Sequence, residues 1–123
     1  MSSRYDQMKE TLLKLIKDNP HIDFAEIVST DGLPIISSID SPEEESKIAA
    51  MAAAISGVAE RFATELKKGK IDQVSLFADN GGVIIVSITP EAYLAVTFTA
   101  GAKLGLILHD INMARRKLSE FMS

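Results

Sequence analysis

Residues 48–59 read IAAMAAAISGVA, a stretch that contains no charged side chain. It lies within residues 42–68, which we predict to form one long helix. Ser41 is a suitable N-cap for this helix, and Glu44 completes the S-x-x-E pattern of a capping box. Gly69, which follows two lysines, is a typical C-cap residue. A helix of this length spans roughly 40 Å, which is long for a chain of 123 residues.

The charge-free stretch is apolar around almost its whole circumference, whereas a helix that rests on a sheet normally exposes a polar face. Helix propensity explains the many alanines, but it does not explain the missing charges on the solvent side. Small residues let a second helix approach closely, and the simplest partner is the same helix of a second copy in a two-fold contact. We expect these helix residues to form the contact: Ile48, Met51, Ala52, Ile55, Val58, Ala59 and Phe62.

Five short apolar runs, separated by turn signals, predict five strands around this helix. Two of them, residues 22–29 and 33–39, are joined by Asp31-Gly32, a strong hairpin signal. Pro34 lacks a backbone donor, so the second of these strands is expected at an edge of the sheet. After the helix the sequence predicts strands at 72–78, 83–88 and 93–99. The run at 83–88 is apolar on both faces, which is typical of a central strand covered on both sides.

Apolar residues at spacings of three and four predict two further helices, at residues 4–18 and 103–121. The element order is therefore α-β-β-α-β-β-β-α. The strands come in antiparallel groups rather than as βαβ crossovers, so we predict an α+β fold with a five-stranded antiparallel sheet. The two terminal helices are expected on the sheet face opposite the long helix.

Composition limits the class of protein. The length of 123 residues favours one domain, and 46% hydrophobic residues exclude a disordered chain. The net charge of −4 disfavours nucleic acid and anionic membranes as partners. The segment MSSRYDQMKE lacks the apolar core of a secretory signal, and no run approaches the ~18 apolar residues of a membrane helix. We therefore expect a cytoplasmic protein.

Motifs for catalysis or cofactor binding are missing from the sequence. There is no cysteine, and the two histidines, His21 and His109, lack metal-ligand spacing. Glu43 to Glu45 point in different directions on a helix and are explained by the helix dipole. Gly81-Gly82 lies between strands, and Gly69-Lys70 precedes one, so neither fits a phosphate-binding loop. We predict no enzyme activity, no cofactor and no metal site.

Several segments together resemble the Roadblock domain family, the small proteins related to dynein Roadblock light chains and to MglB-type partners of a small GTPase. The resemblance covers nearly the whole chain, and it depends on the order and spacing of the segments rather than on one motif. It is carried by residues 24–35 (FAEIVSTDGLPI), the Ala-rich stretch 49–59 with Glu60-Arg61, the strands 83–86 and 94–97, and Ala102 to Ile107 (AKLGLI).

The resemblance implies a profilin-like sandwich, with the long helix on one sheet face and the terminal helices on the other. It also implies a homodimer in which helix 42–68 packs on its copy and edge strand 72–78 joins the two sheets. Val74 and Leu76 would then belong to the interface. Such dimers bind small Ras-like GTPases and modulate the nucleotide cycle without a nucleotide site of their own, and Glu60, Arg61 and Glu65 are candidate contacts to that partner.

Two other functions stay open at this point. The first is a structural adaptor or light-chain-type subunit of a motor or cytoskeletal complex, which nucleotide-independent binding would indicate. The second is a sensor with a small ligand inside the domain, although the apolar strands suggest no polar pocket for one.

Overall fold

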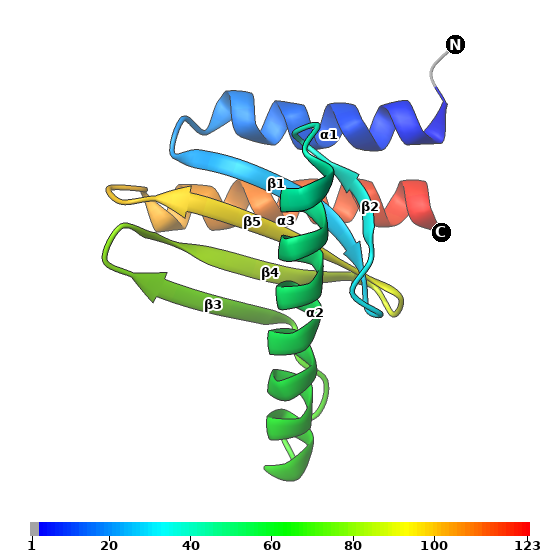
Figure 1. Cartoon of the computed structure of the whole chain (residues 1–123). Coiled ribbons are helices and arrows are strands. Elements are labelled where there is room, and N and C mark those ends of the chain that lie inside the picture. Colours follow the sequence, from blue (N-terminus) through cyan, green and yellow to red (C-terminus); the bar gives the residue numbers. More distant parts are fainter. Residues whose placement is uncertain (1–2) are drawn as a thin grey trace.

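The computed structural model describes residues 3–123 and has the predicted order of helices and strands (Figure 1). One antiparallel sheet carries α2 on one face and α1 and α3 on the other, which confirms the predicted α+β class and helix placement. The first two residues of MSSRYDQMKE lie outside the described residues. The elements are α1 (Arg4–Asp18), β1 (Ile22–Ser29), β2 (Pro34–Ser37), α2 (Pro42–Glu65), β3 (Gln73–Ala78), β4 (Gly81–Thr89), β5 (Ala92–Thr99) and α3 (Leu104–Met122).

The strand order across the sheet is β2-β1-β5-β4-β3. The hairpin predicted at Asp31-Gly32 joins β1 to β2, and β2, which begins at Pro34, is an edge strand as expected. The middle strand is β5, which pairs with both β1 and β4, and β4 is an interior strand between β5 and β3, as expected of residues 83–88. Both faces of β4 are covered, because Ile84 and Val86 belong to the core under the terminal helices and Ile85 to the cluster under α2.

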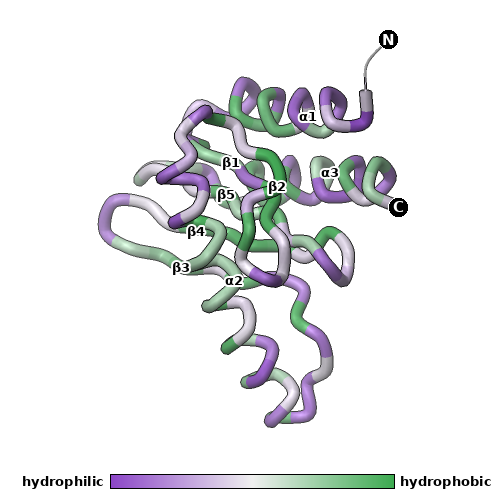
Figure 2. The backbone as a smooth tube through the Cα atoms, turned by 45° about the vertical axis from the view of Figure 1, so that its right-hand side comes forward, coloured by the Kyte–Doolittle hydropathy of each residue, from purple (hydrophilic) through white to green (hydrophobic). Residues whose placement is uncertain are grey.

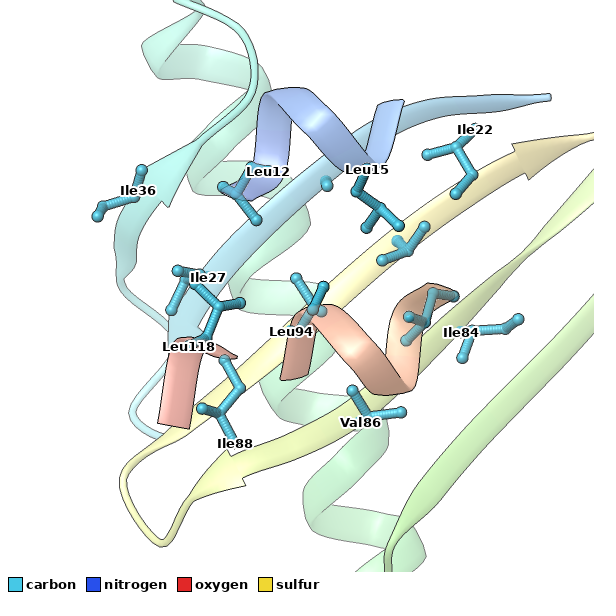
Figure 3. Packing of buried hydrophobic residues seen from close by; sticks show 14 of the residues in the cluster. Leu12, Leu15, Ile22, Ile27, Ile36, Ile84, Val86, Ile88, Leu94 and Leu118 are labelled. Atoms are coloured by element: carbon cyan, nitrogen blue, oxygen red, sulfur yellow. The ribbon is translucent and has the colours of Figure 1, made fainter. Parts of the chain in front are cut away.

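The larger core lies between the sheet and the two terminal helices (Figure 3). Leu12 and Leu15 of α1 and Leu118 of α3 are buried there against sheet residues such as Ile27 and Leu94. The apolar residues of α1 recur at spacings of three and four, which place them on one helical face. Each such side chain contributes about 1.5–3 kcal/mol on full burial, so this face supplies most of the hydrophobic stabilisation.

The helix α2 packs on the sheet through small side chains. Ala49, Ala52 and Ser56 are its buried residues, and they recur at positions that share one helical face. The helix crosses the strands and packs mainly on β1 and β2, while its C-terminal half extends beyond β3 (Figure 1). Because the sheet-facing side chains are small, the larger apolar residues of α2 lie on its flank.

The start of α2 differs from the prediction. Ser41 is the N-cap, but its hydroxyl forms no hydrogen bond to the helix, so the expected capping box with Glu44 does not form. The backbone explains the difference, because Ser41 has a ψ of 89° where Ser3, which does cap α1, has a ψ of 167°. Only the fully extended conformation of Ser3 directs the hydroxyl back to the amide of the third helical residue, Asp6.

The end of α2 also differs. The last helical residue is Glu65 rather than one of the two lysines that follow it. Lys67, with a φ of 57°, adopts the left-handed conformation that we expected of Gly69. The Lys68 amide then donates to the Ala63 carbonyl oxygen at 2.8 Å, as in a Schellman motif. The chain therefore leaves the helix before it reaches the glycine.

Glycines allow β3 and β5 to approach the start of β4. A Cβ atom on Gly82 would lie 2.2 Å from the Leu76 carbonyl oxygen and 2.6 Å from the Phe98 ring. Gly81, with a φ of 135°, is equally close to the Phe98 carbonyl. A side chain at Gly82 would push β3 away from β4, and one at Gly81 would push β4 away from β5.

Candidate interaction surface

Large apolar side chains are exposed along one flank of α2. Val58 is 68% exposed, Phe62 64% and Met51 57%, and Ile55 and Leu66 are exposed as well. These residues are separated by three, four or seven positions, so they form one stripe along the helix. Hydrophobic positions recur along α2 into the part that extends past the sheet (Figure 2). The stripe faces solvent because the sheet contacts only the adjacent, small-residue face.

The edge strand β3 adds to this stripe. Val74 is half-buried and Leu76 is exposed, and both point to the α2 side of the sheet. The next residue, Phe77, points to the opposite side, where its ring packs edge-to-face on Phe98 with centroids 6.1 Å apart. We use the name α2–β3 surface for this set: Ile48, Met51, Ile55, Val58, Phe62 and Leu66 of α2, with Val74 and Leu76 of β3.

A hollow of about 330 Å³ lies between α2 and the β3–β4 side of the sheet. It is open to solvent along the α2–β3 surface and has Thr97 as its one polar side chain. That hydroxyl donates to the Asp23 carboxylate, so the hollow offers no free polar group from its lining side chains. An apolar side chain from outside fits such a space better than a polar ligand. The lining residues are Ile48, Met51, Ala52, Ile55, Val74, Leu76, Val83, Ile85, Ala95 and Thr97.

The two edges of the sheet differ in how open they are. At β2, four residues long, Pro34 removes one amide donor, and the Lys9 amine donates to the Ser37 carbonyl oxygen at 2.5 Å. At β3, six residues long, the sequence QVSLFA contains no proline and no charge. Long, uncharged edge strands are ready to pair with another strand. The open edge is therefore the one next to the α2–β3 surface.

Arg115 of α3 fixes the start of this open strand. Its guanidinium donates to the Asp72 carboxylate at 2.8 Å and also approaches the Asp72 and Ser87 carbonyl oxygens at 3.5 Å. Asn112 accepts a further hydrogen bond from the same group at 2.7 Å. The ion pair and these bonds tie the entry to β3 to the helix behind the sheet.

The residues predicted for the contact have different environments within the protomer. Met51, Ile55, Val58, Phe62 and Leu76 are exposed, whereas Ile48, Ala59 and Val74 are half-buried. Ala52 is only 5% exposed, because it faces the sheet. Sequence reasoning missed Leu66, although its spacing of four from Phe62 continues the same stripe.

The charged residues proposed for a further partner lie on the outer part of α2. Glu60, Arg61 and Glu65 are all exposed. Across residues 3–123 none of the three forms an ion pair. They are therefore free to contact another molecule.

The described residues contain no constellation typical of catalysis. His21 lies 3.2 Å from the Thr99 hydroxyl, and His109 lies 3.2 Å from the Asp110 carboxylate, in separate parts of the fold. The pKa of Asp110 is lowered mainly by a hydrogen bond from Asn19 and, to a smaller extent, by one from His109. In residues 3–123 no three His, Cys, Asp or Glu side chains gather as metal ligands do, and no helix has the length and apolar character to cross a membrane.

Comparison with known proteins gives the family context. Residues 8–98 match the family described as Roadblock/LC7 domain. The protein MJ1340 of Methanocaldococcus jannaschii is 33% identical over 92 residues, which cover 75% of this chain and 80% of that protein.

Solved structures give the same fold. MglB of Myxococcus xanthus superposes with a TM-score of 0.89 at 15% identity, covering 99% of this chain and 92% of that one. A Roadblock/LC7 domain from Streptomyces avermitilis gives a TM-score of 0.88 at 18% identity, covering 93% and 96%. Acanthamoeba castellanii profilin IA gives a TM-score of 0.51 at 16% identity, covering 91% and 97%, in agreement with the expected profilin-like sandwich.

Proposed function

Because this chain belongs to the Roadblock/LC7 domain family, we propose that residues 1–123 act as one domain, a homodimeric scaffold that binds a small Ras-like GTPase and modulates its nucleotide cycle. The observation that carries the proposal is the α2–β3 surface. It combines an exposed apolar stripe, an apolar hollow and an open strand edge in one place. The setting we propose is the cytoplasm.

The shape of this surface favours a second copy as its first occupant. In a two-fold contact the stripe of one α2 covers the hollow of the other protomer, while the two β3 edges pair. Large side chains such as Met51 and Phe62 supply apolar area that stays unused in one protomer. Burial of such area contributes about 25 cal/mol per Å², and each residue counts twice in a symmetric contact.

Charge along α2 favours an antiparallel arrangement of the two helices. The first turn carries Glu43, Glu44 and Glu45, and the chain just past the other end carries Lys67 and Lys68. A two-fold axis perpendicular to the helix brings the acidic end of one copy near the basic end of the other. Opposite charges then face each other at both ends of the apolar stripe.

The dimer would regulate the GTPase by binding alone. A protein that binds one nucleotide-dependent conformation more tightly than the other shifts the population toward it. Glu60, Arg61 and Glu65 are exposed and supply charged contacts for this partner. The mechanism requires no cofactor, metal or catalytic residue from this chain.

The test measures binding of the dimer to Ras-like GTPases encoded in the same genome, each loaded with GDP or with a non-hydrolysable GTP analogue. We expect a preference for one nucleotide state and a change in the rate of hydrolysis or exchange. Reversal of the charge by Glu60→Lys should weaken that binding and leave the dimer mass unchanged, because the spacing of Glu60 places it off the apolar stripe. Equal binding in both states would point to the adaptor function instead, and no binding in either state would refute the proposal.

A further inference from the structure

A buried carboxyl group lies under α2 without a partner. Glu26 of β1 is fully buried, and neither of its side-chain oxygens has a hydrogen-bond partner. It pairs across the sheet with Ser37 of β2 on one side and Ala95 of β5 on the other, and cross-strand partners share a sheet face. Because Ala95 belongs to the cluster beneath α2, Glu26 faces that helix.

The groups around this carboxyl do not neutralise it. Glu45 of α2 is the charged group that influences it, with the same sign, and the Glu45 carboxylate accepts a hydrogen bond from the Ser37 hydroxyl at 2.8 Å. Next along β5 on the same face, the phenol of Tyr93 is buried, and burial raises its pKa. Lys9 of α1 reaches this end of the sheet but donates to the Ser37 carbonyl instead.

Burial and, to a smaller extent, the Glu45 charge raise the pKa of Glu26 to about 8. The group is therefore neutral in the folded protein at neutral pH, whereas it is ionised in the unfolded chain above about pH 4.5. Between these values the folded state holds one more proton than the unfolded state, so stability decreases as the pH rises. Above the folded-state pKa of Glu26 this loss of stability is complete. Below its unfolded-state pKa there is no loss.

The position of Glu26 connects this loss to the helix. Ala49 and Ala52 of α2 belong to the cluster on the sheet face that Glu26 shares, and α2 has its main contacts with β1 and β2. The C-terminal half of α2 extends beyond the sheet, so little else holds the helix (Figure 1). A charge at Glu26 must reach water or a counter-ion, and the packing of α2 is the barrier to both.

We propose that Glu26 is a pH-sensitive element of the α2 packing, whose ionisation loosens the N-terminal half of α2 and, resting on the proposed function, weakens association of the two protomers. The coupling follows because the helix that Glu26 supports also carries the apolar stripe of the α2–β3 surface. A loosened α2 binds its copy less well, since the bound helix must be ordered again.

The first experiment measures urea unfolding and amide hydrogen exchange of α2 from pH 5.5 to 8.5 in the full chain, its Glu26→Gln variant and a Glu10→Gln control. One extra bound proton changes the unfolding constant by up to tenfold per pH unit. We expect this destabilisation with rising pH, and lower exchange protection factors, corrected for the intrinsic pH dependence of amide exchange, at residues 42–56, in the wild type and in the control. Both effects should disappear in Glu26→Gln, with Glu26→Met as the alternative if that variant does not fold. The same pH dependence in every variant would overturn the proposal.

The second experiment measures the dimer dissociation constant over the same pH range. We expect it to increase with pH in the wild type and to be constant in the Glu26 variant. A constant dissociation constant in the wild type, together with lower protection factors in α2, would overturn the coupling to association. A chain that is monomeric at every pH would refute the proposed dimer, while the exchange data would still decide the role of Glu26.

Discussion

Replacement of Val58 by glutamate tests the α2–β3 surface directly. Val58 is 68% exposed in the protomer, so the isolated fold should tolerate Val58→Glu with a stability change of about 0.5 kcal/mol or less. In the proposed dimer the same position is buried. Full burial of a valine contributes about 1.5 kcal/mol or more, and the symmetric contact loses this twice. An unpaired buried charge adds a cost of several kcal/mol.

The sum is at least about 3 kcal/mol of lost association free energy, which corresponds to a dissociation constant raised by about 100-fold or more. Sedimentation velocity over a range of concentrations measures this shift. Thermal unfolding by circular dichroism checks that the protomer remains folded. We chose Val58 rather than Ala52, because Ala52 is buried against the sheet and a charge there would unfold the protomer itself.

Leu13→Glu is the matched control. Leu13 is an aliphatic residue of α1, 45% exposed, on the opposite face of the sheet. The Leu13→Glu substitution introduces the same charge as Val58→Glu, so the net charge of the two variants is equal. We expect the control to keep the dimer mass of the wild type. An unchanged mass for Val58→Glu, or an equal loss in both variants, would show that the interface lies elsewhere.

Three other substitutions test the fold. Leu12→Ala removes a fully buried side chain and should lower the unfolding free energy by about 2–5 kcal/mol, measured by urea denaturation. Gly82→Ala should detach β3, because the new Cβ would overlap the Leu76 carbonyl oxygen, and hydrogen exchange at residues 73–78 should accelerate. Arg115→Met should accelerate exchange at the start of β3 through loss of its ion pair with Asp72, and unchanged protection there would contradict this role.

Much of the architecture could be predicted because it depends on local patterns. The Asp31-Gly32 hairpin, the edge position of Pro34 and the apolar spacing of α1 all depend on neighbours in the sequence. The position of β4 could not be predicted in this way, since an apolar strand is compatible with either side of β5. Pairing between distant segments decides that question.

The candidate surface was also partly predictable. The missing charges in residues 48–59 indicated a helix with two covered sides, but the sequence could not show which small residues face the sheet. The structure assigns Ala52 to the sheet and leaves Val58 and Phe62 outside. Glu26 gave no signal at all, because an alternating strand normally directs its charged residues to solvent, and only the position of α2 buries this one.

The unequal edges of the sheet limit how the protein can assemble. Because Lys9 and Pro34 obstruct β2, each protomer has one edge strand that is open to pairing, β3. In the proposed dimer, in which two β3 strands pair, the joined sheet would present a β2 strand at either end and would not grow further. Loss of the Lys9 amine would remove part of this protection. The groups at the β2 edge would therefore determine whether the protein remains a dimer or extends into a fibre.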